Sequence, residues 1–255
     1  MSYAADLNGK TAVVTGSSSG IGRATALRLA EAGAHVLVHA RANREGAVEV
    51  DNAIHERGVQ STVVLADLAR VEEQDRFATD AWNWRGGVDI LVNNAGADTL
   101  TGEAAQWTYE QKLEALWQVD VVASIRLTRL IGWQMKQRGR GAIVNIGWDQ
   151  VEYGMAGDSG ELFAATKGAV MAFTRSAAQS LAPQVRVNCV APGWIKTSWG
   201  ERASQPWQER AVAESLLARW GTPDDVAAAV EFLVGPAADF ITGQILPVNG
   251  GWKRA

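Results

Sequence analysis

Residues 11–22 read Thr11-Ala12-Val13-Val14-Thr15-Gly16-Ser17-Ser18-Ser19-Gly20-Ile21-Gly22, and this stretch decides the fold. Its first five residues, apolar and rich in β-branched side chains, predict a buried strand. The glycines that follow predict a tight turn leading directly into a helix over residues 21–32. The N–H groups and the positive dipole end at the start of such a helix bind phosphate. The stretch therefore predicts a pyrophosphate site between the first strand and the first helix.

The alternation of strand and helix patterns continues along the rest of the chain. Further strands are predicted over residues 35–39, 61–65, 88–92, 142–146, 185–190 and 244–248, and a long helix over residues 110–137. Strands that alternate with helices pair in parallel. We predict an α/β fold: one Rossmann-like, doubly wound domain over residues 1–255 with a seven-stranded parallel sheet. Two irregular segments, 147–161 and 193–203, follow strands on the side of the sheet where such folds bind ligands.

Composition excludes several classes of function. The 24 Lys and Arg residues against 28 Asp and Glu give a net charge of -4 without a block of like charge, so we expect no nucleic-acid partner. No apolar run reaches the roughly 20 residues of a membrane span, and residues 1–6 do not resemble a signal peptide. We expect a cytoplasmic protein with a small-molecule substrate and without a membrane partner or a metal. The 11 Trp residues, against 3 Tyr and 5 Phe, indicate either scattered core side chains or an aromatic-lined surface.

Several further motifs occur in a fixed order. They are Asp67, Asn93-Asn94-Ala95-Gly96, Lys167, Pro192-Gly193-Trp194-Ile195-Lys196-Thr197, Thr242-Gly243-Gln244 and Val248-Asn249-Gly250-Gly251. Together with the glycine spacing of residues 16–22, this order resembles the short-chain dehydrogenase/reductase family over essentially the whole chain. The resemblance implies a dinucleotide cofactor, a substrate lid over residues 194–218, and a homotetramer or homodimer.

The resemblance also implies which residues surround the cofactor. They are Gly16, Ser18, Gly20, Ile21 and Gly22 at the pyrophosphate, Asp67 and Leu68 at the adenine, Asn94, Ala95 and Gly96 along the cofactor, Lys167 on the nicotinamide ribose, and Pro192, Gly193, Ile195 and Thr197 beside the nicotinamide.

The end of the second strand indicates which cofactor is used. An acidic residue there would bind the ribose hydroxyls of NAD(H), but the chain reads His39-Ala40-Arg41. A guanidinium suits a 2′-phosphate, so NADP(H) is favoured over NAD(H). Two alternatives stay open, since Arg44 could do the same work and Arg41 could be an ordinary surface residue.

The catalytic positions depart from the family pattern, which has a Tyr four residues before the Lys, a Ser on the preceding loop and an Asn in the long helix. Here the Tyr position holds Phe163, whose ring has no exchangeable proton. A general acid typically contributes about 10²- to 10⁴-fold. The Ser position holds Trp148 or Gln150, depending on the end from which the loop is counted. The Asn position holds Asp120, which could pair with Lys167.

Other residues are candidates for the missing roles. Asp149, Tyr153 and Glu161 are candidate proton donors, with Lys167 and Asp120 as the other catalytic residues, and Asp158 is a weaker candidate. We expect Ser159 to cap the following helix. The expected substrate pocket consists of Trp148, Phe163, Trp194 and Trp199, with Trp207 nearby.

We predict an atypical NADP(H)-dependent oxidoreductase that transfers hydride to or from a small, flat enone, imine or carbonyl compound. The loss of Tyr and Ser disfavours simple ketones, because a developing alkoxide needs a donor. Two alternatives stay open. One is a cofactor-binding protein without turnover, and the other is elimination chemistry with Lys167 or Asp120 as base.

Overall fold

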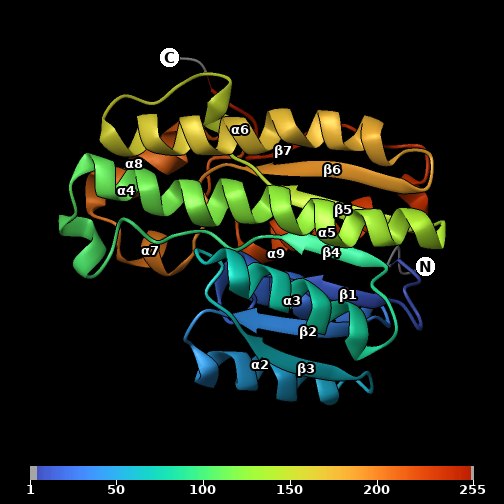
Figure 1. The fold of residues 1–255 in the computed structure, drawn as a ribbon. Coiled ribbons are helices and arrows are strands. Elements are labelled where there is room, and N and C mark those ends of the chain that lie inside the picture. Colours follow the sequence, from blue (N-terminus) through green and yellow to red (C-terminus); the bar gives the residue numbers. More distant parts are fainter. Residues whose placement is uncertain (1–4, 254–255) are drawn as a thin grey trace.

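The computed structural model describes residues 5–253, and the sheet at its centre has the predicted strands (Figure 1). Its seven parallel strands lie in the order β3-β2-β1-β4-β5-β6-β7. Their bounds are β1 Thr11–Val14, β2 His35–Ala40, β3 Ser61–Leu65, β4 Ile90–Asn93, β5 Gly141–Ile146, β6 Val185–Pro192 and β7 Ile245–Val248. The predicted single Rossmann-like domain is confirmed. Residues 1–4, part of the N-terminal segment used for the cytoplasmic expectation, lie outside the described range.

The strand order reverses between β1 and β4. From β1 the chain adds β2 and β3 on one side, and then crosses over to add β4 to β7 on the other. At this switch point β1 pairs with both neighbours, Val13 lying opposite Leu37 of β2 and Leu91 of β4. The loops that leave β1 and β4 therefore diverge, and the crevice between them is where open α/β sheets bind ligands.

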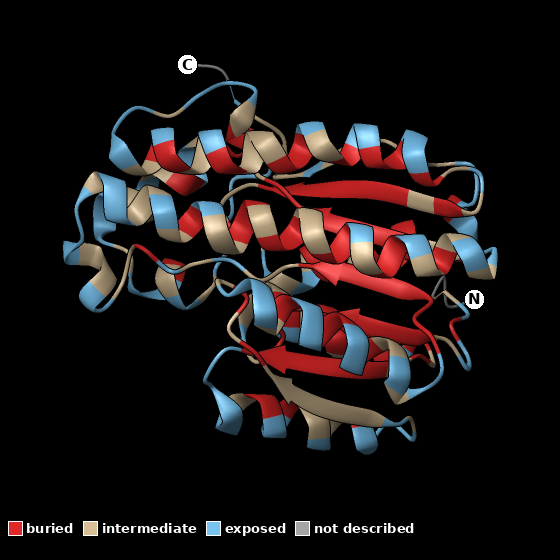
Figure 2. Ribbon diagram, viewed as in Figure 1, coloured by how far each residue is buried: buried red, intermediate tan, exposed pale blue. Residues whose placement is uncertain are grey.

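Helices cover both faces of the sheet. One face carries α1 (Gly20–Glu31), α2 (Arg44–His55) and α9 (Pro223–Val234), and the other carries α3 (Val71–Trp84), α5 (Ala123–Arg138) and α6 (Asp158–Leu181). Figure 2 shows the buried side of each front helix turned toward the sheet. Two apolar clusters, one on each face, form the core. This arrangement leaves the carboxyl ends of the strands as the edge that carries long loops.

The helix predicted over residues 110–137 is interrupted. Helix α4 (Tyr109–Leu116) leads into a π-helical turn over Trp117–Val122, and α5 continues from Ala123. A π-helical turn contains an extra residue, and such turns occur frequently at functional sites. The turn contains Asp120, whose side chain is buried between α6 and the loop after β4. The sequence pattern gave no indication of this turn.

The two irregular segments contain short helices. Within 193–203 lies α7 (Ser198–Arg202), followed by α8 (Gln205–Glu214), so that part of the prediction is wrong. The expected cap at Ser159 is also wrong, because α6 begins at Asp158 and its N-cap is Gly157. Gly157 has a φ of 93°, a conformation that glycine adopts readily, and with Gly157 as the N-cap the helix starts two residues earlier than expected. No helix within residues 5–253 is long and apolar enough to span a membrane.

Candidate functional site

A groove of about 750 Å³ crosses the carboxyl ends of β1, β2 and β4. Most of the residues predicted to bind the cofactor line it: Gly16, Ser18, Gly20, Ile21, Arg41, Asp67, Leu68, Asn94, Ala95, Gly96, Lys167 and Thr197. These residues come from five separate loops and from helices α1 and α6. Their convergence follows from the parallel sheet, in which every strand ends at the same edge.

The turn between β1 and α1 is shaped for the close approach of a ligand. Gly16 and Gly20 have φ values of 65° and 54°, and a Cβ on Gly16 would lie 2.9 Å from the Cα of Ala95. Ser19 is the N-cap of α1, and its side chain makes no capping hydrogen bond. The first N–H groups of α1 are therefore available to an anion, and the turn fits a dinucleotide pyrophosphate.

Gly22 does not line this groove. A Cβ there would lie 2.2 Å from the carbonyl oxygen of Gly16 and 2.5 Å from Nδ2 of Asn94. Gly22 allows the first turn of α1 to pack against the glycine turn, and the structure places it beneath the cofactor groove. Asn94 supports the same turn, because its Nδ2 donates to the carbonyl oxygens of Thr15 at 2.9 Å and Gly16 at 3.1 Å.

A second cavity, of about 380 Å³, adjoins the groove. The two share Ile21, Phe163, Lys167, Thr197 and Trp199, so they meet where a nicotinamide is expected. The second cavity also contains the other residues predicted beside the nicotinamide, Pro192, Gly193 and Ile195. We call it the tryptophan cavity, because Trp148, Trp194, Trp199 and Trp207 all line it.

The aromatic side chains of this cavity contact one another. Trp194 stacks on Trp199 with ring centroids 6.3 Å apart, and it lies 5.4 Å from Trp207. On the opposite wall, the ring of Trp148 lies 6.1 Å from that of Phe163. Trp220, which sequence reasoning missed, packs 6.2 Å from Trp194 and supports the group from outside. The excess of tryptophan in the composition is thus partly explained by one aromatic-lined cavity.

Helix α6 contributes three residues to the tryptophan cavity at intervals of one turn: Ser159, Phe163 and Lys167. Residues four apart on a helix share one face. Sequence reasoning assigned Ser159 to a helix cap and so missed it as a lining residue. The sequence did contain a signal for Ser159, because residues 159, 163 and 167 are four apart and so lie on one face of a helix.

Lys167 and Asp120 form a buried ion pair. Nζ of Lys167 lies 2.8 Å from Oδ1 of Asp120, and these side chains are 12% and 1% exposed. The other carboxylate oxygen of Asp120 accepts the backbone N–H of Ala97 at 2.9 Å. Nζ also donates to the carbonyl oxygen of Ile146 at 3.3 Å. The ammonium charge is therefore neutralised where the groove and the cavity meet.

The three candidate proton donors, Asp149, Tyr153 and Glu161, lie outside both the groove and the tryptophan cavity. Asp149 is buried behind Gly193 and accepts from Nδ2 of Asn249 at 3.0 Å, and burial raises its pKa to about 6 against the opposing hydrogen bond from Asn249. Tyr153 is 49% exposed and stacks on Trp252. Glu161 is exposed and accepts from Tyr109 at 3.4 Å. None of the three lines the groove or the tryptophan cavity.

The fold of the loop explains this result. Gly154 and Gly157 both have positive φ values, 77° and 93°, and the segment between them places Met155 in the cavity wall, whereas Tyr153 and Glu161 lie outside that segment and do not line the cavity. The two residues that the counts give for the Ser position lie in different surroundings. Trp148 lines the cavity, whereas Gln150 is buried away from it, with no hydrogen-bond partner for either side-chain polar atom among the described residues.

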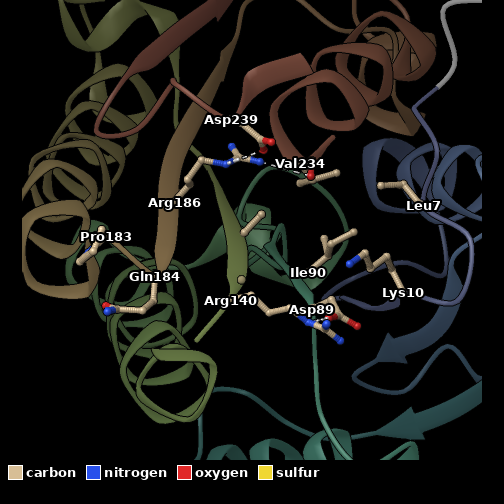
Figure 3. Close-up of a pocket in the computed structure, with 12 residues that line it drawn as sticks. Leu7, Lys10, Asp89, Ile90, Arg140, Pro183, Gln184, Arg186, Val234 and Asp239 are labelled. Carbon is tan, nitrogen blue, oxygen red and sulfur yellow. Dashed lines mark hydrogen bonds and ion pairs between the residues drawn. The ribbon is translucent and has the colours of Figure 1, made fainter. Parts of the chain in front are cut away.

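A third cavity, of about 310 Å³, lies at the opposite edge of the sheet (Figure 3). Its charged side chains are mostly paired with each other. Arg140 lies 3.1 Å from Asp89, and Arg186 lies 3.7 Å from Asp239 while donating to the carbonyl oxygens of Leu233 and Val234. These groups already have partners, so this cavity is a structural feature at the start of the strands.

The comparisons with known proteins agree with this geometry. A family model described as Enoyl-(Acyl carrier protein) reductase matches residues 16–253. Dehydrogenase/reductase SDR family member 4 of Sus scrofa is 34% identical over 251 residues, which are 96% of this chain and 88% of that protein.

Two solved structures are similar to this chain over nearly its whole length. A 7α-hydroxysteroid dehydrogenase complexed with NADH and 7-oxo glycochenodeoxycholic acid is 30% identical, with a TM-score of 0.88 and coverage of 98% of this chain and 96% of that one. A short chain dehydrogenase from Burkholderia cenocepacia in complex with NADP is 33% identical, with a TM-score of 0.86 and coverage of 96% and 98%. The chain therefore belongs to the short-chain dehydrogenase/reductase family and is an oxidoreductase of that type.

Proposed function

We propose that the protein is an NADP(H)-dependent oxidoreductase that transfers hydride to or from a small, flat substrate with a C=N, enone or carbonyl group. One observation carries the proposal. The cofactor groove opens, at Lys167 and Phe163, into a cavity with aromatic walls that is large enough for one small molecule.

The residues present fit the cofactor. The free N–H groups at the start of α1 bind the pyrophosphate, and Lys167 binds the nicotinamide ribose. Arg41 is exposed at the rim of the groove, and among the described residues its guanidinium has no hydrogen-bond partner, so it is available to a 2′-phosphate. When bound, the cofactor supplies the hydride donor or acceptor at its nicotinamide ring. The Burkholderia cenocepacia neighbour, which is in complex with NADP, supports this choice, whereas the hydroxysteroid dehydrogenase neighbour is complexed with NADH.

The chemistry of the walls favours substrates that need no proton from the protein. Beside Lys167, the cavity presents the rings of Phe163 and Trp148, at the positions where the family resemblance implies hydroxyl groups. A ketone that accepts hydride becomes an alkoxide and needs a donor, whereas an iminium ion becomes a neutral amine. The faces of Trp194 and Trp199 would also attract a cationic, flat ring. An iminium compound is therefore the preferred substrate within this class.

The segment over residues 194–218 acts as the substrate lid in this proposal. It contains α7 and α8, and it supplies Trp194, Trp199 and Trp207 to the cavity wall. Trp194 is held in place by Glu214, which accepts its indole N–H at 2.8 Å. Closure of this segment would exclude water during hydride transfer.

The test uses NADPH deuterated on the face from which hydride is transferred. The protein is incubated with it and with a panel of cyclic imines, enones and ketones, and products are analysed by mass spectrometry. We expect deuterium in the imine products, and its loss in the Lys167→Ala variant. Deuterium in ketone products alone would contradict the preference for iminium compounds.

A second candidate is a cofactor-binding protein without turnover. The observation that favours it is the aromatic lining of the positions where catalytic hydroxyl groups are expected. Tight NADPH binding without deuterium transfer to any compound would support this candidate. The elimination alternative is less favoured, because Lys167 and Asp120 are already paired with each other at 2.8 Å.

The homo-oligomer also remains a proposal. Phe232 on α9 and Phe240 after it are 44% and 104% exposed, which is unusual for large apolar side chains and supports self-association. Light scattering of the purified protein would measure the assembly, and a monomer at micromolar concentration would contradict it.

A further inference from the structure

His39, the penultimate residue of β2, lies beneath the glycine turn of the cofactor groove. The residue is only 2% exposed, yet it forms part of the groove lining. The backbone N–H of Gly16 donates to Nδ1 of His39 at 2.9 Å, and Nε2 lies 3.0 Å from the carbonyl oxygen of Ala66. An N–H group only donates and a carbonyl oxygen only accepts, so Nδ1 carries the lone pair and Nε2 carries the hydrogen. The imidazole is therefore neutral, in one tautomer.

The backbone of His39 is connected to the same turn. The N–H of Ser17 donates to the carbonyl oxygen of His39 at 2.8 Å, and the N–H of His39 donates to Oγ of Ser17 at 2.9 Å. The edge of the Phe77 ring packs on the imidazole with centroids 4.9 Å apart. Three hydrogen bonds thus join His39 to Gly16 and Ser17, and a fourth joins it to the residue that follows β3.

We infer that His39 is a positioning residue for cofactor binding: it holds Gly16 and Ser17 in the conformation that leaves the first N–H groups of α1 free for the pyrophosphate. The reasoning is geometric. The imidazole Nδ1 accepts the Gly16 N–H, so this N–H points toward His39 beneath the turn. Through its two nitrogens the ring links the turn after β1 to Ala66, the residue that follows β3, and so anchors the turn to the sheet.

The neutral state of the ring also matters. Burial lowers the pKa of His39 to about 4, against the hydrogen bond to Ala66, so the ring stays neutral at pH 7. A carboxylate in place of the imidazole would accept the N–H of Gly16. It could not donate a hydrogen bond to the carbonyl oxygen of Ala66. It would also repel the phosphates of the cofactor. A neutral ring with one acceptor and one donor satisfies both neighbours.

Three variants separate the contribution of the Nδ1 acceptor from that of the Nε2 donor. His39→Asn places an acceptor near the position of Nδ1, His39→Gln places a donor near the position of Nε2, and His39→Leu removes both. His55→Gln, a change at a half-exposed histidine of α2, is the matched control. The dissociation constants of NADPH and of adenosine 2′-phosphate, which lacks the pyrophosphate, are measured by calorimetry well below the melting temperature of each variant.

For His39→Leu we expect the dissociation constant of NADPH to rise about tenfold, as for the loss of one well-formed hydrogen bond. That of adenosine 2′-phosphate should stay within about twofold, because it does not use the turn. His39→Asn should recover more of the NADPH affinity than His39→Gln. If His39→Leu does not fold, the Asn and Gln variants carry the comparison.

The inference is overturned if NADPH affinity is unchanged in a folded His39→Leu variant, if both ligands weaken equally, or if His39→Gln recovers more affinity than His39→Asn. It rests on the proposed function in one respect, namely that the chain binds NADPH. Absence of NADPH binding by the unmodified protein would contradict the proposed function itself, and that result is distinguishable from a loss specific to His39.

Discussion

The Nζ atom of Lys167 on α6 lies 2.8 Å from Oδ1 of Asp120 on the π-helical turn, and this pair stands at the junction of the cofactor groove and the tryptophan cavity. A lysine beside a phenol would lower the pKa of the phenol, but the position one turn before Lys167 holds Phe163. The charge of Lys167 has a carboxylate partner here instead. The site is therefore close to neutral where the reacting atoms of a substrate are expected.

Removing one partner of the ion pair between Lys167 and Asp120 should destabilise the folded protein. In Lys167→Ala the buried carboxylate of Asp120 keeps the N–H of Ala97 but loses its counter-charge, and we expect unfolding free energy to fall by about 2–4 kcal/mol. In Asp120→Asn the single amide oxygen can still accept from one of the two donors, Nζ of Lys167 or the N–H of Ala97, so the expected loss is smaller, about 1–2 kcal/mol. Urea unfolding measures both variants. A larger loss in Asp120→Asn than in Lys167→Ala would contradict the buried pair.

The pH dependence of stability should reflect the ionisation of the Asp149 carboxyl group. Burial raises its pKa from 3.8 to about 6, so the folded protein favours the protonated carboxyl. The stabilisation is complete below the unfolded pKa, near 4, and is lost as the pH rises through about 6. Asp149→Asn should thus be more stable than the unmodified protein by about 1–2 kcal/mol at pH 7.5. Urea unfolding at several pH values measures this difference, which should shrink toward pH 4. An advantage independent of pH would disprove the assignment.

Arg41 should determine the choice between cofactors. A ligand that binds only the folded state raises the melting temperature. We expect NADPH to raise it more than NADH at equal concentration, and Arg41→Ala to lose most of this difference with little change in the NADH effect. Arg44→Ala is the matched control on the neighbouring helix. If Arg44→Ala abolishes the difference and Arg41→Ala does not, the assignment moves to Arg44.

Restoring the phenol alone should not create a ketone reductase. Phe163→Tyr supplies a proton donor one turn before Lys167, but Trp148, whose ring lies 6.1 Å from that of Phe163, still lines the cavity and supplies no hydroxyl group. We expect less than a tenfold gain in the rate of NADPH oxidation with ketones, well below the roughly 10²- to 10⁴-fold that a complete general acid contributes. The double variant with Trp148→Ser is the comparison. A gain of a hundredfold in Phe163→Tyr alone would show that Trp148 does not limit this chemistry.

The predicted fold came from local patterns that the structure preserves. The run over residues 11–22 forms β1, the glycine turn and the start of α1, because strand and helix periodicities and glycine's positive φ are properties of a few neighbouring residues. The parallel sheet edge then explains why Asp67, Asn94 and Lys167, far apart in the chain, all line one groove. These residues were predicted from the order of the motifs, which resembles the family pattern.

The loop after β5 and the long helix depended on contacts from distant segments. Asp149, Tyr153 and Glu161 could each be reasonable proton donors by residue type, but their directions are set by Asn249, Trp252 and Tyr109, which lie 52 to 100 residues away. Ser159 was assigned to a cap, although the face of α6 that meets the cavity includes it. The π-helical turn that carries Asp120 likewise has no local signature.

The sequence by itself thus determined the parallel sheet and the glycine turn, because both follow from short-range periodicity, while the residues expected along the cofactor groove were implied by the resemblance of its motifs to a known family. The tertiary structure alone placed Trp148 in the wall, turned Asp149 behind Gly193 and brought Asp120 to Lys167. The direction of a side chain in a loop or a widened helical turn depends on long-range packing, which residue types and spacing do not encode.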